Sequence, residues 1–288
     1  MLAPGNRRTK TGRIRTYVVD DRPWAGERPP AAPYRYSQDR KGERPAGHLR
    51  DFAGTIHADG YAGYEALTRS KTPPGQGAQR IVHAECWAHA LRKLYDEHHK
   101  TRSPIAAGGL RRIGALYDIE RCSNGLPPER RQAIRAQRTV PLLADLGTSM
   151  EAERRRLSRK NERAQALQYA LSCWETLARF ATDGCLAIDN NAAERALRGI
   201  AATRKNFLLL GSDKGGERAV IIYTALETAG STASTPRPGL PMSSTSSPVA
   251  AASSTWNRSW PGIDGNAWKT NFVHHVGEAG RPTSRPSR

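Results

Sequence analysis

Acidic residues follow short apolar segments at two points of the chain, and a third lies in a polar stretch further along. Asp20, with its neighbour Asp21, and Asp59 each end a β-branched segment, whereas Glu194 lies in the polar stretch. Two Mg²⁺ ions held by such carboxylates can activate a water or hydroxyl group and stabilise the leaving oxygen in phosphodiester cleavage. Asp20, with Asp21 as the alternative, Asp59 and Glu194 are therefore the candidates for catalytic, metal-holding residues.

Each carboxylate also has a purely structural interpretation. Asp20-Asp21-Arg22-Pro23 is compatible with a turn that carries a local ion pair, and Asp59-Gly60 with a simple turn. Glu194 lies three residues after Asn191, as in a capping box, and four before Arg198, as in a helical ion pair.

Cys86-Trp-Ala-His89 has the spacing of one of the two ligand pairs of a zinc site. Three further histidines lie nearby: His83, His98 and His99. A structural zinc site needs a second ligand pair, and the chain offers one cysteine here. We therefore favour a packed helix start, with Trp87 in the core and His89 near the active site.

The charge balance points to a polyanionic partner. The 288 residues include 45 Lys and Arg against 27 Asp and Glu, a formal net charge of +18. Such a field concentrates phosphate-bearing ligands, and DNA is the partner that we expect. Basic residues that could contact DNA phosphates cluster beside Glu194; the alternative is a solvated helix face. They are Arg195, Arg198, Arg204 and Lys205.

Hydrophobic periodicity predicts an α/β core interrupted by an all-helical insertion. Strands are expected at 16–20, 33–37, 55–59, 81–84 and 207–210, and helices at 45–52, 87–98, 191–200 and 216–228. Between them, apolar residues recur with a period near 3.6 from 105 to 180. The predicted domains are a first core segment at 1–100, the helical insertion at 101–183, and the remainder of the core at 184–229.

Residues 230–288 are expected to form a disordered tail, because their Ser, Thr and Pro content leaves little apolar surface to bury. Codons compatible with Gly230–Pro241 also encode a Leu-Asn-Gly segment in a second frame, so we infer a frameshift near Gly230.

Apolar runs are too short to span a bilayer, and the basic start lacks the apolar core of a secretory signal. Four cysteines without paired short spacing indicate reduced thiols. We therefore expect a cytoplasmic protein without a membrane partner.

Several motifs in order resemble insertion sequence 66 family transposases over residues 2–229. They are Thr9-Lys-Thr-Gly-Arg13, Tyr17-Val-Val-Asp-Asp-Arg-Pro23, Tyr36-Ser-Gln-Asp-Arg-Lys-Gly-Glu43, Ala58-Asp-Gly-Tyr-Ala-Gly-Tyr64, Cys86-Trp-Ala-His89, Ile188-Asp-Asn-Asn-Ala-Ala-Glu-Arg-Ala-Leu-Arg198, Arg204-Lys-Asn206 and Gly211-Ser-Asp-Lys-Gly-Gly-Glu-Arg218.

This resemblance implies a ribonuclease H-like fold and a DDE triad of Asp20, Asp59 and Glu194. It also implies two Mg²⁺ ions, cleavage and strand transfer at transposon ends, a homo-oligomeric synaptic complex and association with the bacterial nucleoid. Family members carry a DNA-recognition region ahead of this segment, so we expect an N-terminally truncated copy. The alternative function is a catalytically inactive, basic DNA-binding remnant.

Overall fold

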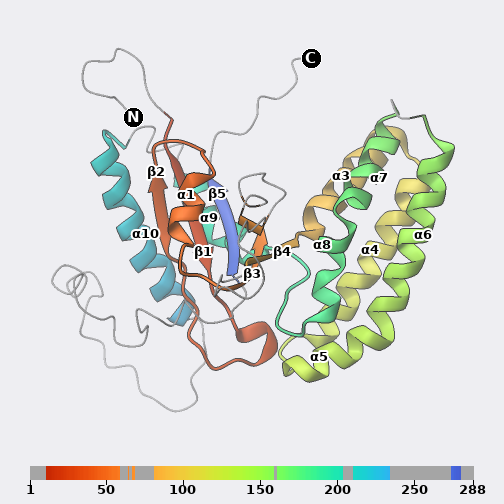
Figure 1. Cartoon of the computed structure of the whole chain (residues 1–288), viewed down its shortest axis with the longest axis horizontal. Helices are drawn as coiled ribbons and strands as arrows, with labels where there is room; N and C mark the ends of the chain where they lie inside the picture. The colour runs from red at the N-terminus through yellow and green to blue at the C-terminus, as the bar shows by residue number, and fades with distance from the viewer. Residues whose placement is uncertain are drawn as a thin grey trace, which may run out of the picture.

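The computed structural model describes residues 11–58, 64, 67–68, 81–158, 161–203, 210–233 and 274–279. In these ranges a five-stranded sheet lies beside a block of long helices (Figure 1). The predicted mixed α/β class is confirmed. The finer assignment, a ribonuclease H-like core with a helical insertion, stays a prediction.

The sheet is mixed, with the strand order β2-β1-β5-β3-β4. Its strands are β1 (Arg13–Val18), β2 (Tyr34–Ser37), β3 (Gly54–Ala58), β4 (Ile81–Glu85) and β5 (His274–Ala279). β1 pairs antiparallel with both β2 and β5, whereas β3 pairs parallel with both β4 and β5. β1 and β3 therefore run in opposite directions on either side of β5.

Helices cover both faces of the sheet. Successive side chains of a strand point to opposite faces, so each face packs different residues of the same strand against its helices. They are α1 (Glu43–His48), α9 (Asn191–Thr203) and α10 (Asp213–Ala233). Ile14 and Val18 of β1 pack in one core with residues of α9 and α10. Tyr17, between them in β1, belongs to a second core with Leu49 and Phe52, which follow α1.

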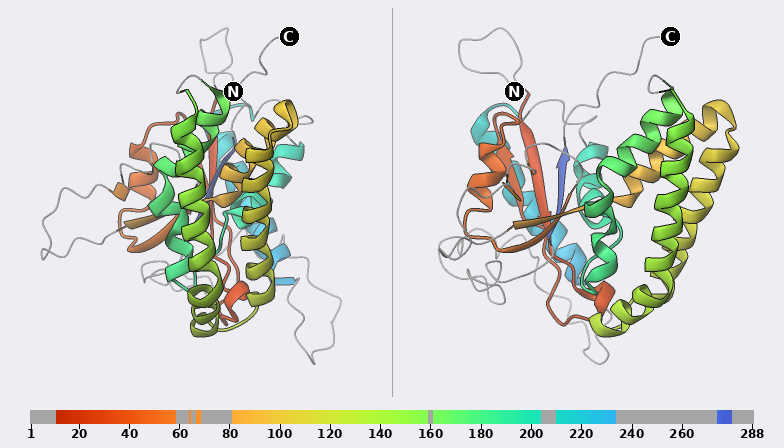
Figure 2. Two further views of the ribbon diagram at one scale, coloured as in Figure 1. Left: turned by 90° about the vertical axis from the view of Figure 1, so that its right-hand side faces the viewer. Right: turned by 45° about the vertical axis from the view of Figure 1, so that its right-hand side comes forward.

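The remaining helices are α3 and those of residues 104–182. We call residues 104–182 the helical block, and α3 precedes it in the chain. These helices and turns are α3 (Trp87–Thr101), α4 (Pro104–Ser123), α5 (Pro128–Ile134), a π-helical turn (Arg135–Thr139), α6 (Val140–Arg156), α7 (Glu162–Ser172), α8 (Trp174–Ala178) and a 3₁₀ turn (Arg179–Thr182). The long helices α4 and α6 run side by side (Figure 2). Their shared core contains Ile113, Leu116 and Leu146, all fully buried.

Most expected elements are present, and the differences have local causes. The first strand ends at Val18, and its neighbour Val19 makes only an isolated bridge to Ala31. A 3₁₀ helix follows at Arg22–Trp24, where Pro23 fixes the backbone for a helical turn. The strand expected at 207–210 lies outside the described residues, except for Leu210.

The tail differs from the expectation of disorder at two described segments: residues 230–233 are the end of α10, and residues 274–279 form β5. β5 occupies the middle of the sheet, where β1 and β3 supply hydrogen-bonding partners on both sides. The prediction depended on composition within the tail, and composition carries no information about an open position between two distant strands. The other tail residues after Ala233 lie outside the described ranges.

No helix in the described ranges is both long enough and apolar enough to cross a membrane.

A half-buried histidine beneath the sheet makes stability depend on pH. Nδ1 of His48 lies 2.8 Å from the hydroxyl of Tyr17. Burial, together with the positive charges of Arg35, Arg15 and Arg44, lowers the pKa of His48 from 6.5 to about 4. The unfolded chain therefore takes up this proton first. We expect thermal stability to be fully present above pH 6.5 and to decline as the pH falls towards 4.

The measurement is the unfolding temperature between pH 7 and 4 for the wild type and for His48→Gln, which has no ring to protonate. Carboxylates also titrate in this range, so the difference between the two proteins isolates the histidine. Parallel curves for the two proteins would contradict the prediction.

Candidate active site

Glu194 lies on the first turn of α9 with its carboxylate open to solvent. Its side chain is 48% exposed, and Oε1 is 3.7 Å from Nε2 of His89 on the first turn of α3. The sequence interpretation that placed His89 near the active site agrees with this contact. An exposed carboxylate beside a histidine is free to accept a cation from the solvent side.

The capping-box interpretation of Glu194 does not apply. Because α9 begins at Asn191, Glu194 is the fourth helical residue, whereas a capping box uses the third. The backbone amide of Asn190 donates instead to Sγ of Cys86, at 3.4 Å. In the described part of the chain, the side chain within ion-pair distance of Glu194 is His89, which is charged only when protonated, and not Arg198. The argument for a purely structural role of Glu194 is therefore weaker than its spacing in the sequence indicated.

Cys86 is a buried packing residue in this structure. Burial raises the pKa of its thiol to about 12, so the sulfur stays protonated. The sulfur accepts a hydrogen bond from the backbone amide of Asn190. A zinc ligand is a thiolate. In the ranges that the structure describes, no three His, Cys, Asp or Glu side chains are grouped as metal ligands. Both observations favour the packed helix start over the zinc interpretation.

Asp189 is a second carboxylate beside Glu194, and the sequence analysis did not single it out. It accepts hydrogen bonds from the backbone amide and side-chain Nδ2 of Asn191, at 3.1 and 2.7 Å. Burial raises its pKa, while hydrogen bonds from Asn191 and Tyr117 act in the opposite direction. Asp189 therefore orders the start of α9. Its place five residues before Glu194 in one motif was the available signal.

Asp20 and Asp21 lie just beyond β1, and each has an arginine partner. Both carboxylate oxygens of Asp20 accept from the guanidinium of Arg22, each at 2.7 Å. Asp21 pairs with Arg28, also at 2.7 Å. The turn with a local ion pair is thus present, and both aspartates are buried. This geometry leaves the choice between Asp20 and Asp21 open.

Asp59 lies outside the described residues, but β3, the strand that precedes it, is described. Ala58, the last residue of β3, is paired in register with Glu85, the last residue of β4. After Glu85 the chain passes through Cys86 into α3, which carries His89. The end of β3 therefore lies beside the segment that contacts Glu194.

The sheet brings the C-terminal ends of β1 and β3 to the same level, because Val18 and His57 are both paired with His275 of β5, which lies between the two strands. A shared core links the end of β1 to the other segments. Trp24, just after Asp20 and Asp21, belongs to the same buried cluster as Trp87 of α3 and Leu186 and Ile188 ahead of α9. The segments after β1, after β4 and before α9 are thus tied to one core.

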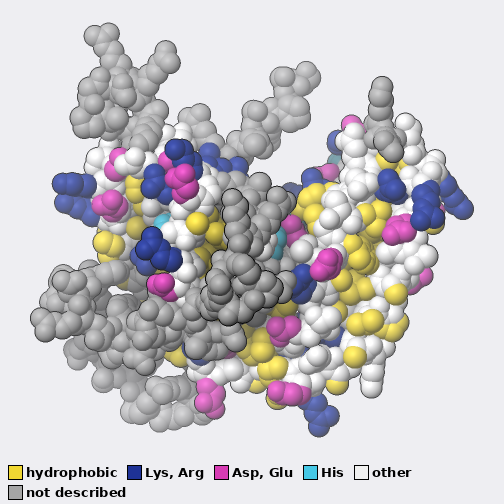
Figure 3. Space-filling view, in the orientation of Figure 1, with side chains coloured by type: hydrophobic (Ala, Val, Ile, Leu, Met, Phe, Trp, Pro, Cys, Tyr) yellow, Lys and Arg dark blue, Asp and Glu magenta, His cyan; other side chains and the backbone are white. Residues whose placement is uncertain are grey.

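Of the four basic residues expected to contact DNA, two are described. Arg195 and Arg198 are exposed on α9. Arg204 and Lys205 lie outside the described residues. Lys and Arg side chains are spread over both the sheet and the helical block on the face in Figure 3, with Asp and Glu side chains among them.

Comparison with known proteins defines the class of protein. The family model described as "Transposase IS66 family" matches residues 1–218. The chain belongs to the IS66 transposase family, as its motifs predicted.

Its relatives include two proteins of Sinorhizobium fredii (strain NBRC 101917 / NGR234). "Uncharacterized protein y4hP" is 40% identical over 230 residues, covering 76% of this chain and 41% of the relative. "Uncharacterized protein y4qI" is 36% identical over 227 residues, covering 79% and 42%. The chain thus spans about two fifths of the length of the curated relatives that it matches. No solved structure matches it significantly.

Proposed function

We propose that this chain is the catalytic segment of a DDE transposase that cleaves DNA at insertion-sequence ends and transfers the freed strand to target DNA. The observation that carries the proposal is the position of Glu194. It is exposed, contacts His89 at the start of α3, and lies on a helix whose motif matches the family. The same proposal includes a ribonuclease H-like core and action in the cytoplasm at the nucleoid.

The donor set of the proposed site is suited to magnesium. Asp20, Asp59 and Glu194 offer carboxylate oxygens, which are the ligands that hard divalent cations prefer. Bound Mg²⁺ ions would activate the attacking water or 3′-hydroxyl and neutralise charge that develops on the leaving oxygen. Glu194 is accessible for this role as it is. Asp20 would either share its carboxylate between Arg22 and the metal ion or release Arg22.

The pairing of Asp20 also favours a second candidate function. A carboxylate with both oxygens bound by a guanidinium has fewer lone pairs left for a metal ion, and the positive charge beside it repels a cation. A chain fixed in that state would be the catalytically inactive, basic DNA-binding remnant. It would bind phosphate through its positive charge without cleaving DNA.

Nicking of supercoiled DNA separates these two functions. The catalytic proposal expects nicking by this chain, or by a version extended to the length of its relatives, with Mg²⁺ and none with a chelator. DNA binding without nicking in both versions would support the inactive remnant instead. Synaptic assembly predicts that the extended version forms a homo-oligomer on DNA carrying element ends.

DNA affinity is expected to fall steeply with salt and to depend little on sequence, because net charge drives binding. The logarithm of the affinity should fall by about 0.9 per phosphate contact for each unit of the logarithm of salt concentration. Replacing Arg195 and Arg198 with alanine should reduce that slope by about 2. Fluorescence anisotropy with one labelled duplex between 50 and 300 mM salt, a range of about sixfold, measures the slope.

The matched control is the double alanine variant of Arg155 and Arg156, which are exposed at the end of α6. It removes the same charge at a distant surface and should change the slope less. Equal slopes for the two double variants would show that α9 is not the contact surface.

A further inference from the structure

The eight residues that precede α9 form an irregular segment with a well-defined set of hydrogen bonds. We call residues 183–190 the connector, because they join the helical block to α9. Its residues Leu186 and Ile188 are buried in the core of the block. An irregular buried segment needs partners for its backbone carbonyls, since unpaired polar groups are costly away from water.

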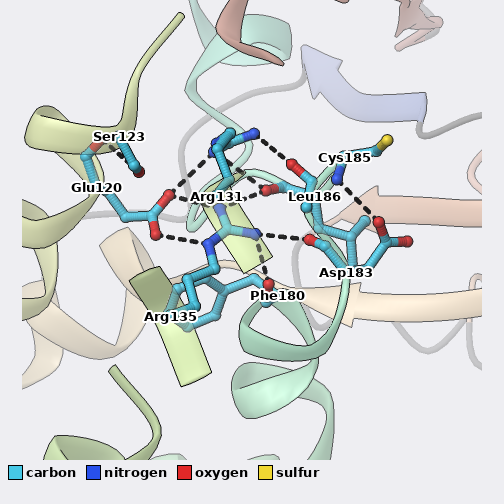
Figure 4. Close-up of polar contacts among 9 residues, drawn as sticks. Glu120, Ser123, Arg131, Arg135, Phe180, Asp183, Cys185 and Leu186 are labelled. Carbon is cyan, nitrogen blue, oxygen red and sulfur yellow. Dashed lines mark hydrogen bonds and ion pairs between the residues drawn. The ribbon is translucent and has the colours of Figure 1, made fainter. Parts of the chain in front are cut away.

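Two arginines of the helical block supply these partners (Figure 4). Nη1 of Arg135, in the π-helical turn, donates to the carbonyls of Phe180 and Asp183, each at 2.6 Å. Its Nη2 donates to the Leu186 carbonyl at 2.8 Å. Arg131 of α5 donates to the Gly184 carbonyl at 2.6 Å. Four carbonyls in and just before the connector are thus held by two guanidinium groups.

A single carboxylate fixes both guanidinium groups in place. Glu120 of α4 accepts from Nε and Nη2 of Arg135 at 2.8 and 2.6 Å, and from Nη2 of Arg131 at 3.1 Å. Arg135 is fully buried and Arg131 is 2% exposed. Burying this triad has a large desolvation cost, which apolar residues of the same volume would avoid. Its planar donors, by contrast, hold an irregular backbone in one conformation.

The connector is packed closely against the same part of the block. A Cβ atom at Gly184 would lie 2.0 Å from the carbonyl oxygen of Pro128, so only glycine fits there. At the other end, the backbone amide of Trp87 donates to Ile188 at 3.2 Å, and that of Asn190 to Cys86. Both ends of the connector are therefore fixed.

The start of α9 depends on the last residue of the connector. The backbone amides of Ala193 and Glu194 donate to the carbonyl oxygen of Asn190, at 3.0 and 3.3 Å. A shift of the connector moves this carbonyl and with it the first turn of α9. Arg135 thus holds the connector as far as Leu186, four residues of chain continue from there to Asn190, and the Asn190 carbonyl binds the backbone of Glu194.

We propose that Arg131 and Arg135, held by Glu120, are positioning residues for Glu194. Through them the helical block fixes the connector, and the connector sets where α9 begins and where its carboxylate stands. The role of Glu194 in this inference rests on the proposed function, whereas the control of α9 by the connector does not. The helical block is therefore part of the active-site scaffold.

Arg135→Lys tests the proposal, since lysine keeps the positive charge but lacks the fork that reaches three carbonyls. Leu146→Ala is the control: it loosens the core of the same block but removes no hydrogen bond from the connector. Hydrogen exchange in the whole chain reports the protection of the amides of Ala193 and Glu194 relative to those of Ile113 and Leu116. We expect Arg135→Lys to lower this relative protection at least about tenfold and Leu146→Ala not to lower it.

Arg131→Lys, which removes the Gly184 contact, is the second variant if Arg135→Lys does not fold, and the same direction is expected. Native relative protection in the folded variant, or an equal loss in Leu146→Ala, would overturn the proposal. In a cleaving protein, kcat should fall about a hundredfold, because small misplacements are costly, with KM for DNA unchanged. A native kcat would likewise overturn it.

The two readouts distinguish this proposal from the proposed function. If Glu194→Gln leaves cleavage unchanged while exchange responds as expected, the catalytic assignment fails and the control of α9 by the connector stands. If cleavage depends on Glu194 but exchange does not respond to Arg135→Lys, the catalytic assignment stands and the positioning role fails.

Discussion

Glu194→Gln is expected to abolish Mg²⁺-dependent DNA cleavage and to leave the fold and DNA affinity close to those of the wild type. Glutamine keeps the shape of the side chain but loses the charge that holds a divalent cation. Residues that merely orient metal ligands cost 10- to 100-fold when replaced, so loss of a ligand should lower the cleavage rate at least about a hundredfold. Single-turnover cleavage of labelled DNA, in a chain extended to the length of its relatives, measures this rate.

The structure offers a matched control for this substitution. Glu175 of α8 is a glutamate whose side chain is 92% exposed and pairs with Arg179, the first residue of the following 3₁₀ turn. Glu175→Gln removes the same charge away from α9 and should cleave at the wild-type rate. If Glu194→Gln cleaves as fast as Glu175→Gln, Glu194 is not a catalytic residue.

Trp87→Ala is expected to lower the free energy of unfolding by about 3–5 kcal/mol. Trp87 is fully buried, donates from Nε1 to the carbonyl of Leu177 at 2.8 Å, and contacts Trp174 edge to face. Truncation leaves a cavity where α3, α8 and the segment before α9 meet, and it leaves a buried carbonyl without its donor. Urea unfolding followed by tryptophan fluorescence and circular dichroism measures the change.

Trp87→Phe separates the two contributions, since it keeps most of the aromatic volume and loses the donor. It should cost less than the alanine variant. A loss below about 1 kcal/mol for Trp87→Ala would show that this core can close around the gap, contrary to the packing described.

Elements with a strong local pattern could be predicted from the sequence. α3 and α9 begin where expected, because their buried residues recur at helical spacing and polar residues precede them. The four strands of the described core have the β-branched or aromatic character typical of a sheet. β5 could not be predicted, because its stability comes from β1 and β3, which are more than 200 residues away in sequence.

The site shows the same division between local and distant information. The exposure of Glu194 on a helix and the local pair of Asp20 with Arg22 follow from short-range spacing. The roles of Arg131 and Arg135 do not, since two arginines four residues apart on a helix usually form a solvated face. Their burial depends on Glu120 and on the carbonyls of the connector, which the fold alone brings to them.

Manganese binding is the most direct test of a shared metal site, because Mn²⁺ replaces Mg²⁺ at oxygen ligands and is visible by electron paramagnetic resonance. If Asp20, Asp59 and Glu194 hold the same ions, the variants Asp20→Asn, Asp59→Asn and Glu194→Gln should each weaken Mn²⁺ binding at least about tenfold. Asp145→Asn, at an exposed aspartate of α6 that pairs with Arg112, is the control and should bind as the wild type does. Wild-type Mn²⁺ affinity in all three variants would contradict a shared metal site.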